Sequence, residues 1–324
     1  MITRRNLLVG GGVAVSAGAV AVAARDRSEA PRPAPAASAA SASASAVREV
    51  RDVIAAQPSS DGAGVKLKRA LGGRMLAMLD PFLLLDEIQS DDPNDYLAGF
   101  PDHPHRGFET VTYMIHGAME HKDSVGNRGR LGPGAAQWMT AGRGIVHSEM
   151  PKQERGLMWG FQLWVNLPAA RKMIPPRYQD IAPERVPEVE KDGARVRVVA
   201  GRALGADGPV RGIDVDPTFL DVTTPRGARF TQPLPAEHAS FVYVTDGAVR
   251  LGAGRREVRR GQLAVLGDGA ALLVEGASES PGRLLLFAGR PLREPVARSG
   301  PFVMSTHDEL RQAFEDYRAG RLGT

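Results

Sequence analysis

Short alternations of apolar and polar residues recur along the chain, and they predict an all-β protein. Residues 65–71 (VKLKRAL) and 159–165 (WGFQLWV) each alternate with a period of two. This period places the apolar side chains of a strand on one face, as in a strand that is half buried. Turns rich in glycine and proline separate such runs, which is typical of barrels built from many short strands.

The predicted strands form two series, and a chain of 324 residues is long enough for about two domains. The first series also contains short runs at residues 82–87, 111–115, 119–124, 135–140 and 144–149. A second series follows a proline-interrupted connection, with runs at residues 195–200, 218–222, 240–245, 262–266, 271–275 and 283–288. We therefore expect two tandem barrels, the first within residues 47–185 and the second within residues 186–324.

The C-terminal end of the chain predicts one amphipathic helix. Apolar side chains recur there with helical spacing, at Leu310, Ala313, Phe314 and Tyr317. Thr306 with Glu309 fits a capping box at the start of this helix. We expect the helix to pack on a barrel.

The first 46 residues differ in composition from the rest. Residues 1–24 combine Thr3-Arg4-Arg5-Asn6-Leu7-Leu8 with a weakly apolar, glycine-rich run, which resembles a twin-arginine export signal. An uncleaved membrane anchor is the alternative for this run, although its glycines make it a poor one. Residues 25–46 are rich in alanine, serine and proline, and they predict a disordered linker. The mature protein would then be periplasmic or otherwise exported, with no stable membrane insertion.

Charge and cysteine content narrow the function classes. The formal net charge is +4, and without Arg4 and Arg5 the chain has 39 basic and 37 acidic residues. So small an excess gives little support for nucleic-acid binding, and we expect no nucleic-acid partner. The chain has no cysteine, which excludes disulfides and thiolate ligands.

Two short histidine pairs predict a metal site in the first barrel. His103 and His105 are two residues apart, as are His147 and Glu149, and the chain has only seven histidines. Residues i and i+2 of a strand point to the same face, so both pairs can aim at one point. Three neutral nitrogens and one carboxylate suit a divalent transition metal. Pro104 cannot donate to a ladder, which places the first pair at a strand start or sheet edge.

The second series of strands lacks such pairs. In the second series of strands His238 is the single histidine, and no H-x-H or H-x-E pair accompanies it. We therefore expect the second barrel to hold no metal.

These motifs resemble the pirin family of the cupin superfamily. The resemblance is carried by F-P-D-H-P-H-R-G-F-E-T-V-T-Y at 100–113, Q-W-M-T-A-G-R-G-I-V-H-S-E-M-P at 137–151, D-P-F-L-L-L-D-E at 80–87 and G-P-F-V-M-S-T at 300–306. It implies a bicupin: two jelly-roll barrels (double-stranded β-helices), with the metal in the first and a C-terminal helix. By the same resemblance the ligands are His103, His105, His147 and Glu149. Many cupins instead use a glutamate soon after the H-x-H pair, and Glu109 has that place and the same strand parity. Glu109 is therefore the alternative ligand.

The resemblance also implies an activity. Some pirins are similar to quercetin 2,3-dioxygenase, which opens the ring of a flavonol with dioxygen at a mononuclear non-haem metal. We expect one divalent metal ion, Fe(II) in the first place, with Mn, Ni, Cu, Co or Zn as alternatives. Glu149 would act as general base toward the hydroxyl of a small, flavonol-like aromatic substrate. A metal-dependent binding or redox-sensing module without turnover is the alternative function, and we expect a monomer.

Overall fold

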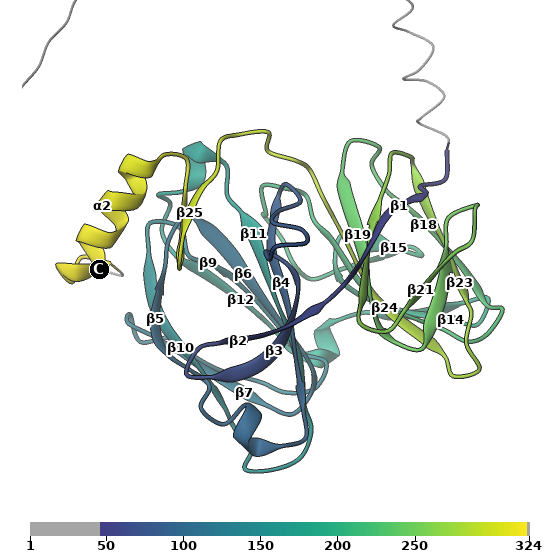
Figure 1. Cartoon of the computed structure of the whole chain (residues 1–324), viewed down its shortest axis with the longest axis horizontal. Coiled ribbons are helices and arrows are strands. Elements are labelled where there is room, and N and C mark those ends of the chain that lie inside the picture. Colours follow the sequence, from purple (N-terminus) through teal and green to yellow (C-terminus); the bar gives the residue numbers. More distant parts are fainter. Residues whose placement is uncertain (1–45, 323–324) are drawn as a thin grey trace, which may run out of the picture. The chain divides into compact units, whose positions relative to one another are not determined.

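The computed structural model describes residues 46–322. The predicted export signal and almost all of the predicted linker therefore lie outside the described residues. The described part of the chain is built from β-strands, with one α-helix, α2 (His307–Arg318), near the C-terminus (Figure 1). The predicted all-β fold of two tandem barrels is confirmed. Within residues 46–322 no helix is long and apolar enough to cross a membrane.

The first barrel is made of two antiparallel sheets. In spatial order, the larger sheet contains β12 (Arg177–Ile181), β9 (Ala136–Thr140), β6 (Phe108–His116), β11 (Met158–Asn166), β4 (Phe82–Ser90), β3 (Val65–Leu71) and β2 (Gln57–Asp61). The smaller sheet contains β5 (Phe100–His105), β10 (Ile145–Pro151), β7 (Met119–Asp123) and β8 (Arg128–Leu131). Strand β5 lies at the edge of its sheet, as the proline between its two histidines predicted.

The second barrel repeats this strand order. Its larger sheet contains β1 (Val50–Ala55), β22 (Gln262–Leu266), β19 (Ala239–Asp246), β24 (Gly282–Gly289), β17 (Thr218–Thr224), β14 (Ala194–Ala200) and β13 (Glu188–Lys191). Its smaller sheet contains β18 (Arg229–Pro233), β23 (Ala271–Gly276), β20 (Ala248–Leu251) and β21 (Arg256–Arg259). Strand β18 is thus the counterpart of β5, and β23 is the counterpart of β10.

The two ends of the described chain cross over between the barrels, so β1 and the C-terminal segment each pack on the other barrel than the expected ranges, 47–185 and 186–324, assign to them. Strand β1 pairs with β22 of the second barrel, although it precedes the first barrel in the sequence. Arg48, just before β1, is buried and donates hydrogen bonds to the backbone carbonyls of Pro235, Ala236, His238 and Gly267. Apolar alternation predicts a strand but not its pairing partner. The pairing of β1 with the second barrel therefore could not be predicted from the sequence pattern.

The C-terminal segment crosses in the opposite direction. It contains β25 (Ala297–Ser299), β26 (Phe302–Met304) and α2, and it packs on the first barrel. The backbone N–H of Val303 donates to the carbonyl of Arg106, and the Arg106 guanidinium pairs with Asp316 at 2.7 Å. Thr306 and Glu309 form the predicted capping box of α2. This segment therefore lies against the turn that follows β5.

The interiors of the two barrels differ in chemistry. The second barrel is filled by a cluster of buried aliphatic and aromatic side chains that includes Phe230, Leu272 and Val274. A second cluster joins the barrels, because it contains Phe161 of the first and Phe241 of the second. The first barrel, in contrast, buries histidines and glutamates on β5, β6 and β10.

Candidate metal centre

Three imidazoles converge inside the first barrel. Strands β5 and β10 run antiparallel with His147 opposite His103, so the histidines at 103, 105 and 147 share one face of this pair. One ring nitrogen of each lies within 4.8 Å of the other two, and the Nε2 atoms of His103 and His105 are 3.1 Å apart. The structure thus brings together three of the four predicted ligands.

Backbone carbonyls orient two of the three rings. Nδ1 of His103 lies 2.8 Å from the carbonyl oxygen of Pro101, and Nδ1 of His105 lies 3.4 Å from that of Pro301. A carbonyl only accepts, so each Nδ1 carries the proton of the neutral ring and each Nε2 keeps a lone pair. Such contacts at the distal nitrogen fix the tautomer of metal-binding histidines. In this tautomer both Nε2 lone pairs, 3.1 Å apart, are available to a cation bound between the rings.

His147 supplies an independent sign that a cation fits here. Both of its ring nitrogens are buried and have no hydrogen-bond partner among the described residues. Buried polar atoms are normally hydrogen-bonded, and an unpaired one costs free energy. Burial and the neighbouring imidazoles lower the pKa of His105 and His147 well below its usual range. These two rings are therefore neutral, which is the form that binds a metal.

Glu149 stands beside the imidazoles but outside their close group. A β-bulge separates it from His147 in the pairing with β5. Its carboxylate accepts hydrogen bonds from Thr112 Oγ1 at 2.9 Å and from Gln162 Nε2 at 2.8 Å. It lines the same cavity as His103 and His105. In this arrangement the carboxylate is held by two neighbouring side chains and faces the space where a ligand would bind.

Glu109, the alternative ligand, lies elsewhere. The turn at Gly107 ends β5, and a new strand begins at Phe108, so the parity counted from His105 does not continue through the turn. The Glu109 carboxylate accepts from Trp138 Nε1 at 3.1 Å and Thr140 Oγ1 at 2.7 Å. Burial raises the pKa of Glu109 to about 7. It does not line the cavity of the imidazoles.

A cavity of about 590 Å³ opens beside the imidazoles. This volume lies in the range of pockets that bind small organic ligands. Its walls combine apolar and charged side chains, including those of Leu67, Ile88, Phe100, Trp164, Arg69 and Arg298. The Trp164 ring meets the His105 ring edge-on, with 5.2 Å between centroids. Trp164 is therefore a wall of the cavity.

Several residues of this site were not predicted from the sequence. Thr112 and Gln162 hold Glu149, and Arg298 and Pro301 reach the cavity from the C-terminal segment. The motif at residues 300–306 drew attention to that segment, but nothing in its pattern gave it a place beside the histidines. The C-terminal segment lies beside the histidines because the end of the chain crosses back to the first barrel.

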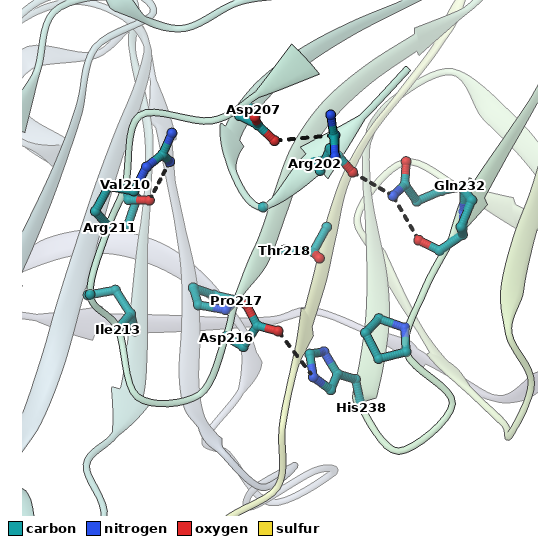
Figure 2. Close-up of a pocket in the computed structure, with 14 residues that line it drawn as sticks. Arg202, Asp207, Val210, Arg211, Ile213, Asp216, Pro217, Thr218, Gln232 and His238 are labelled. Atoms are coloured by element: carbon teal, nitrogen blue, oxygen red, sulfur yellow. Dashed lines mark hydrogen bonds and ion pairs between the residues drawn. The ribbon is translucent and has the colours of Figure 1, made fainter. Parts of the chain in front are cut away.

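A second cavity, of about 520 Å³, is lined by residues between 201 and 218 and between 232 and 238 (Figure 2). Gln232 near the end of β18 and His238 before β19 line it, and His238 Nε2 is 4.0 Å from Asp216 Oδ2. Arg202 pairs there with Asp207 at 3.4 Å. Within residues 46–322 no second group of three metal-binding side chains exists. That the second barrel holds no metal stays a prediction.

Comparison with known proteins identifies the family. Residues 64–165 match the family model of Pirin, and residues 219–323 match that of the Pirin C-terminal cupin domain. The chain belongs to the pirin family. The bicupin architecture implied by the resemblance is thereby confirmed, and a cluster of three histidines in a pirin is compatible with a divalent metal.

Pirins from distant organisms resemble the chain over most of its length. A pirin-like protein of Caulobacter vibrioides is 48% identical over 278 residues, which cover 85% of this chain and 99% of that protein. Human Pirin is 43% identical over 274 residues, covering 83% and 92%. Among solved structures, a quercetin 2,3-dioxygenase from Acinetobacter baumannii superposes with a TM-score of 0.79 at 32% identity, covering 86% of this chain and 99% of that one.

Proposed function

We propose that this pirin is a metal-dependent dioxygenase that opens the ring of quercetin, a related flavonol or a similar aromatic enol. The observation that carries the proposal is the group of three converging imidazoles, of which His103 and His105 line a cavity together with Glu149. The similarity to a solved quercetin 2,3-dioxygenase supports the same reaction class. Fold alone does not establish function, so the argument depends on the site.

The proposed metal is a single divalent ion, Fe(II) in the first place, with Mn, Ni, Cu, Co or Zn as alternatives. His103, His105 and His147 would hold it through nitrogen, and Glu149 is the proposed fourth ligand. When bound, such an ion supplies Lewis acidity and, for a redox-active metal, a route for electrons to dioxygen.

In the proposed reaction the protein contributes a base and a dry, shaped cavity. The Glu149 carboxylate takes the proton of the substrate hydroxyl, and Thr112 and Gln162 keep it oriented toward the cavity. The apolar walls formed by Ile88 and Phe100 limit the access of water to the deprotonated substrate. A small aromatic compound and dioxygen would then be the two partners of the protein.

Replacing Glu149 with glutamine tests this assignment. A general base contributes about 10²–10⁴-fold in rate, so Glu149→Gln should lose turnover by that order even under excess metal that restores occupancy. Glu109→Gln is the matched control, because Glu109 is also a buried glutamate of the first barrel but lies outside the cavity. The assay is oxygen consumption together with loss of flavonol absorbance, with the iron, manganese, nickel and copper forms compared.

Two results would count against the proposal in different ways. No oxygen uptake above the metal-free control in any metal form would leave a metal-dependent binding or redox-sensing module. Full turnover in metal-loaded Glu149→Gln would leave the proposed enzyme activity in place but would show that Glu149 is not its base.

Export by the twin-arginine route is part of the proposal, and it is supported by the sequence of residues 1–24 alone. Cell fractionation tests it.

A further inference from the structure

Arg298 brings a positive charge to the cavity from the C-terminal segment. It lies on β25, and its guanidinium carbon is 4.7 Å from the centroid of the Trp164 ring, in a cation–π contact. Trp164 in turn contacts the ring of His105. Together these contacts place the guanidinium within about 10 Å of the His105 ring. A small polycyclic aromatic molecule is therefore long enough to reach from the guanidinium to the imidazoles.

The guanidinium of Arg298 has no carboxylate partner in the part of the chain that the structure describes. The two acidic side chains whose charges act on it, Asp86 and Asp61, are paired with Arg69 instead. Arg69 donates to both oxygens of Asp86, at 2.8 and 2.6 Å, and to Asp61 at 2.9 Å. The one hydrogen bond of the Arg298 guanidinium within residues 46–322 runs from Nη1 to the Leu83 carbonyl, at 3.0 Å.

Most of the donors of Arg298 are therefore free to bind a ligand. A guanidinium has five N–H donors in a planar fork, and this shape matches the two oxygens of a carboxylate. The side chain is only partly exposed, and Trp164 restricts its position, so little conformational freedom would be lost on binding. A partly buried charge without an ionic partner is less favourable than a paired one, and an anionic ligand would reduce that cost.

We propose that Arg298 forms an anion-binding subsite of this cavity, and that the preferred ligand is an aromatic hydroxy compound carrying a carboxylate. The carboxylate binds Arg298, and the hydroxyl lies at the opposite end, near His103, His105 and Glu149. The assignment of the hydroxyl end rests on the proposed function, whereas the anion subsite does not. Neutral flavonols fit the same space but leave the guanidinium unpaired.

A pair of probes that differ only in charge tests the subsite. We would measure binding of 3-hydroxyflavone-4′-carboxylate and of its methyl ester to the zinc-loaded protein under argon, by titration calorimetry. In the wild type the acid should bind about 10- to 100-fold more tightly than the ester, as expected for a hydrogen-bonded charge pair. In Arg298→Gln the acid should lose that advantage while the ester keeps its affinity. Arg298→Lys, which retains the charge, should keep part of the affinity advantage of the acid over the ester.

The ratio of acid to ester affinity is internal to each variant, so a general loss of stability does not imitate the expected result. Equal losses for acid and ester in Arg298→Gln would mean that Arg298 only supports the cavity wall, and would overturn the subsite. An unchanged preference for the acid in Arg298→Gln, or no binding of either probe to the wild type, would overturn it too. The measurement requires neither dioxygen nor turnover, so it stands or fails separately from the dioxygenase proposal.

Discussion

Two glutamates of the first barrel show how strongly the chemistry of a residue depends on its position in a strand. Glu109 and Glu149 are both buried and both close in sequence to a histidine pair. Sequence parity could not separate them, because it was counted through the turn at Gly107, where the strand in fact ends. The histidine pairs were easier to predict, since each lies within one strand and its spacing of two survives folding. What the sequence could not supply was the set of neighbours: Trp138 and Thr140 for Glu109, and Thr112 and Gln162 for Glu149.

The environment of Glu109 predicts a pH-dependent stability. Its pKa is raised from an ordinary value of 4.5 to about 7 in the folded protein, chiefly by burial. Between these two values the folded chain keeps the proton and the unfolded chain loses it, so the free energy of unfolding falls as pH rises and levels off above about 7. One unit of pKa corresponds to about 1.4 kcal/mol, so the fall attributable to Glu109 is about 3 kcal/mol.

Glu109→Gln removes this contribution and leaves every other titrating group in place. Urea unfolding of the metal-free wild type and variant should therefore show a stability difference that shifts in favour of the variant between about pH 5 and about pH 8. Two stability curves that run parallel over this range would show that Glu109 is ionised throughout.

At the scale of secondary-structure elements, local patterns predicted more than pairing did. Alternation predicted most strands of both barrels, and side-chain spacing with the capping box at Thr306 predicted helix α2. Leu310 and Ala313 of its apolar face are buried, whereas Tyr317 is 40% exposed. The partners of β1 and of the C-terminal segment could not be predicted from the sequence, because they depend on contacts between distant residues, such as Arg48 and His238, which are 190 positions apart.

The docking of the C-terminal segment on the β5–β6 turn predicts that Gly107 tolerates no side chain. Gly107 has a positive φ of 87°, and a Cβ there would lie 2.0 Å from the carbonyl oxygen of Val303. Lys172 joins the same two backbone positions, since its Nζ donates to the carbonyls of Gly107 and Val303. Gly107→Ala should therefore displace the segment as well as strain the turn, and the added cost should be at least about 1–3 kcal/mol.

Gly126→Ala is the matched control, because Gly126 has a similar φ of 94° but nothing within 4 Å of its added Cβ. This variant should show only the backbone cost of roughly 1 kcal/mol. Both variants carry the backbone cost of a side chain at a positive φ, but only Gly107→Ala should also displace the C-terminal segment. Thermal unfolding of the two variants separates these costs. Equal losses of stability would mean that the C-terminal segment is not displaced by a side chain at residue 107.

At the scale of the whole molecule, two barrels share one strand order but have different interiors. In the first, β5 and β10 carry histidines and a glutamate. In the second, Phe230 of β18 and Leu272 and Val274 of β23 belong to an apolar core. The distribution of histidines in the sequence already predicted this difference between the barrels. Histidines are few in the chain, and the strands of the second series carry none of the closely spaced pairs found in the first. We therefore expect one metal ion per chain, in the first barrel.

Elemental analysis of the purified, metal-reconstituted protein tests this claim most directly. The wild type should contain one equivalent of metal per chain, and so should His238→Ala, which alters the second barrel alone. The double variant His105→Ala, His147→Ala should lose most of its metal, because two of the three converging imidazoles are gone. Full occupancy in that double variant, or a loss of metal in His238→Ala, would contradict a metal centre in the first barrel.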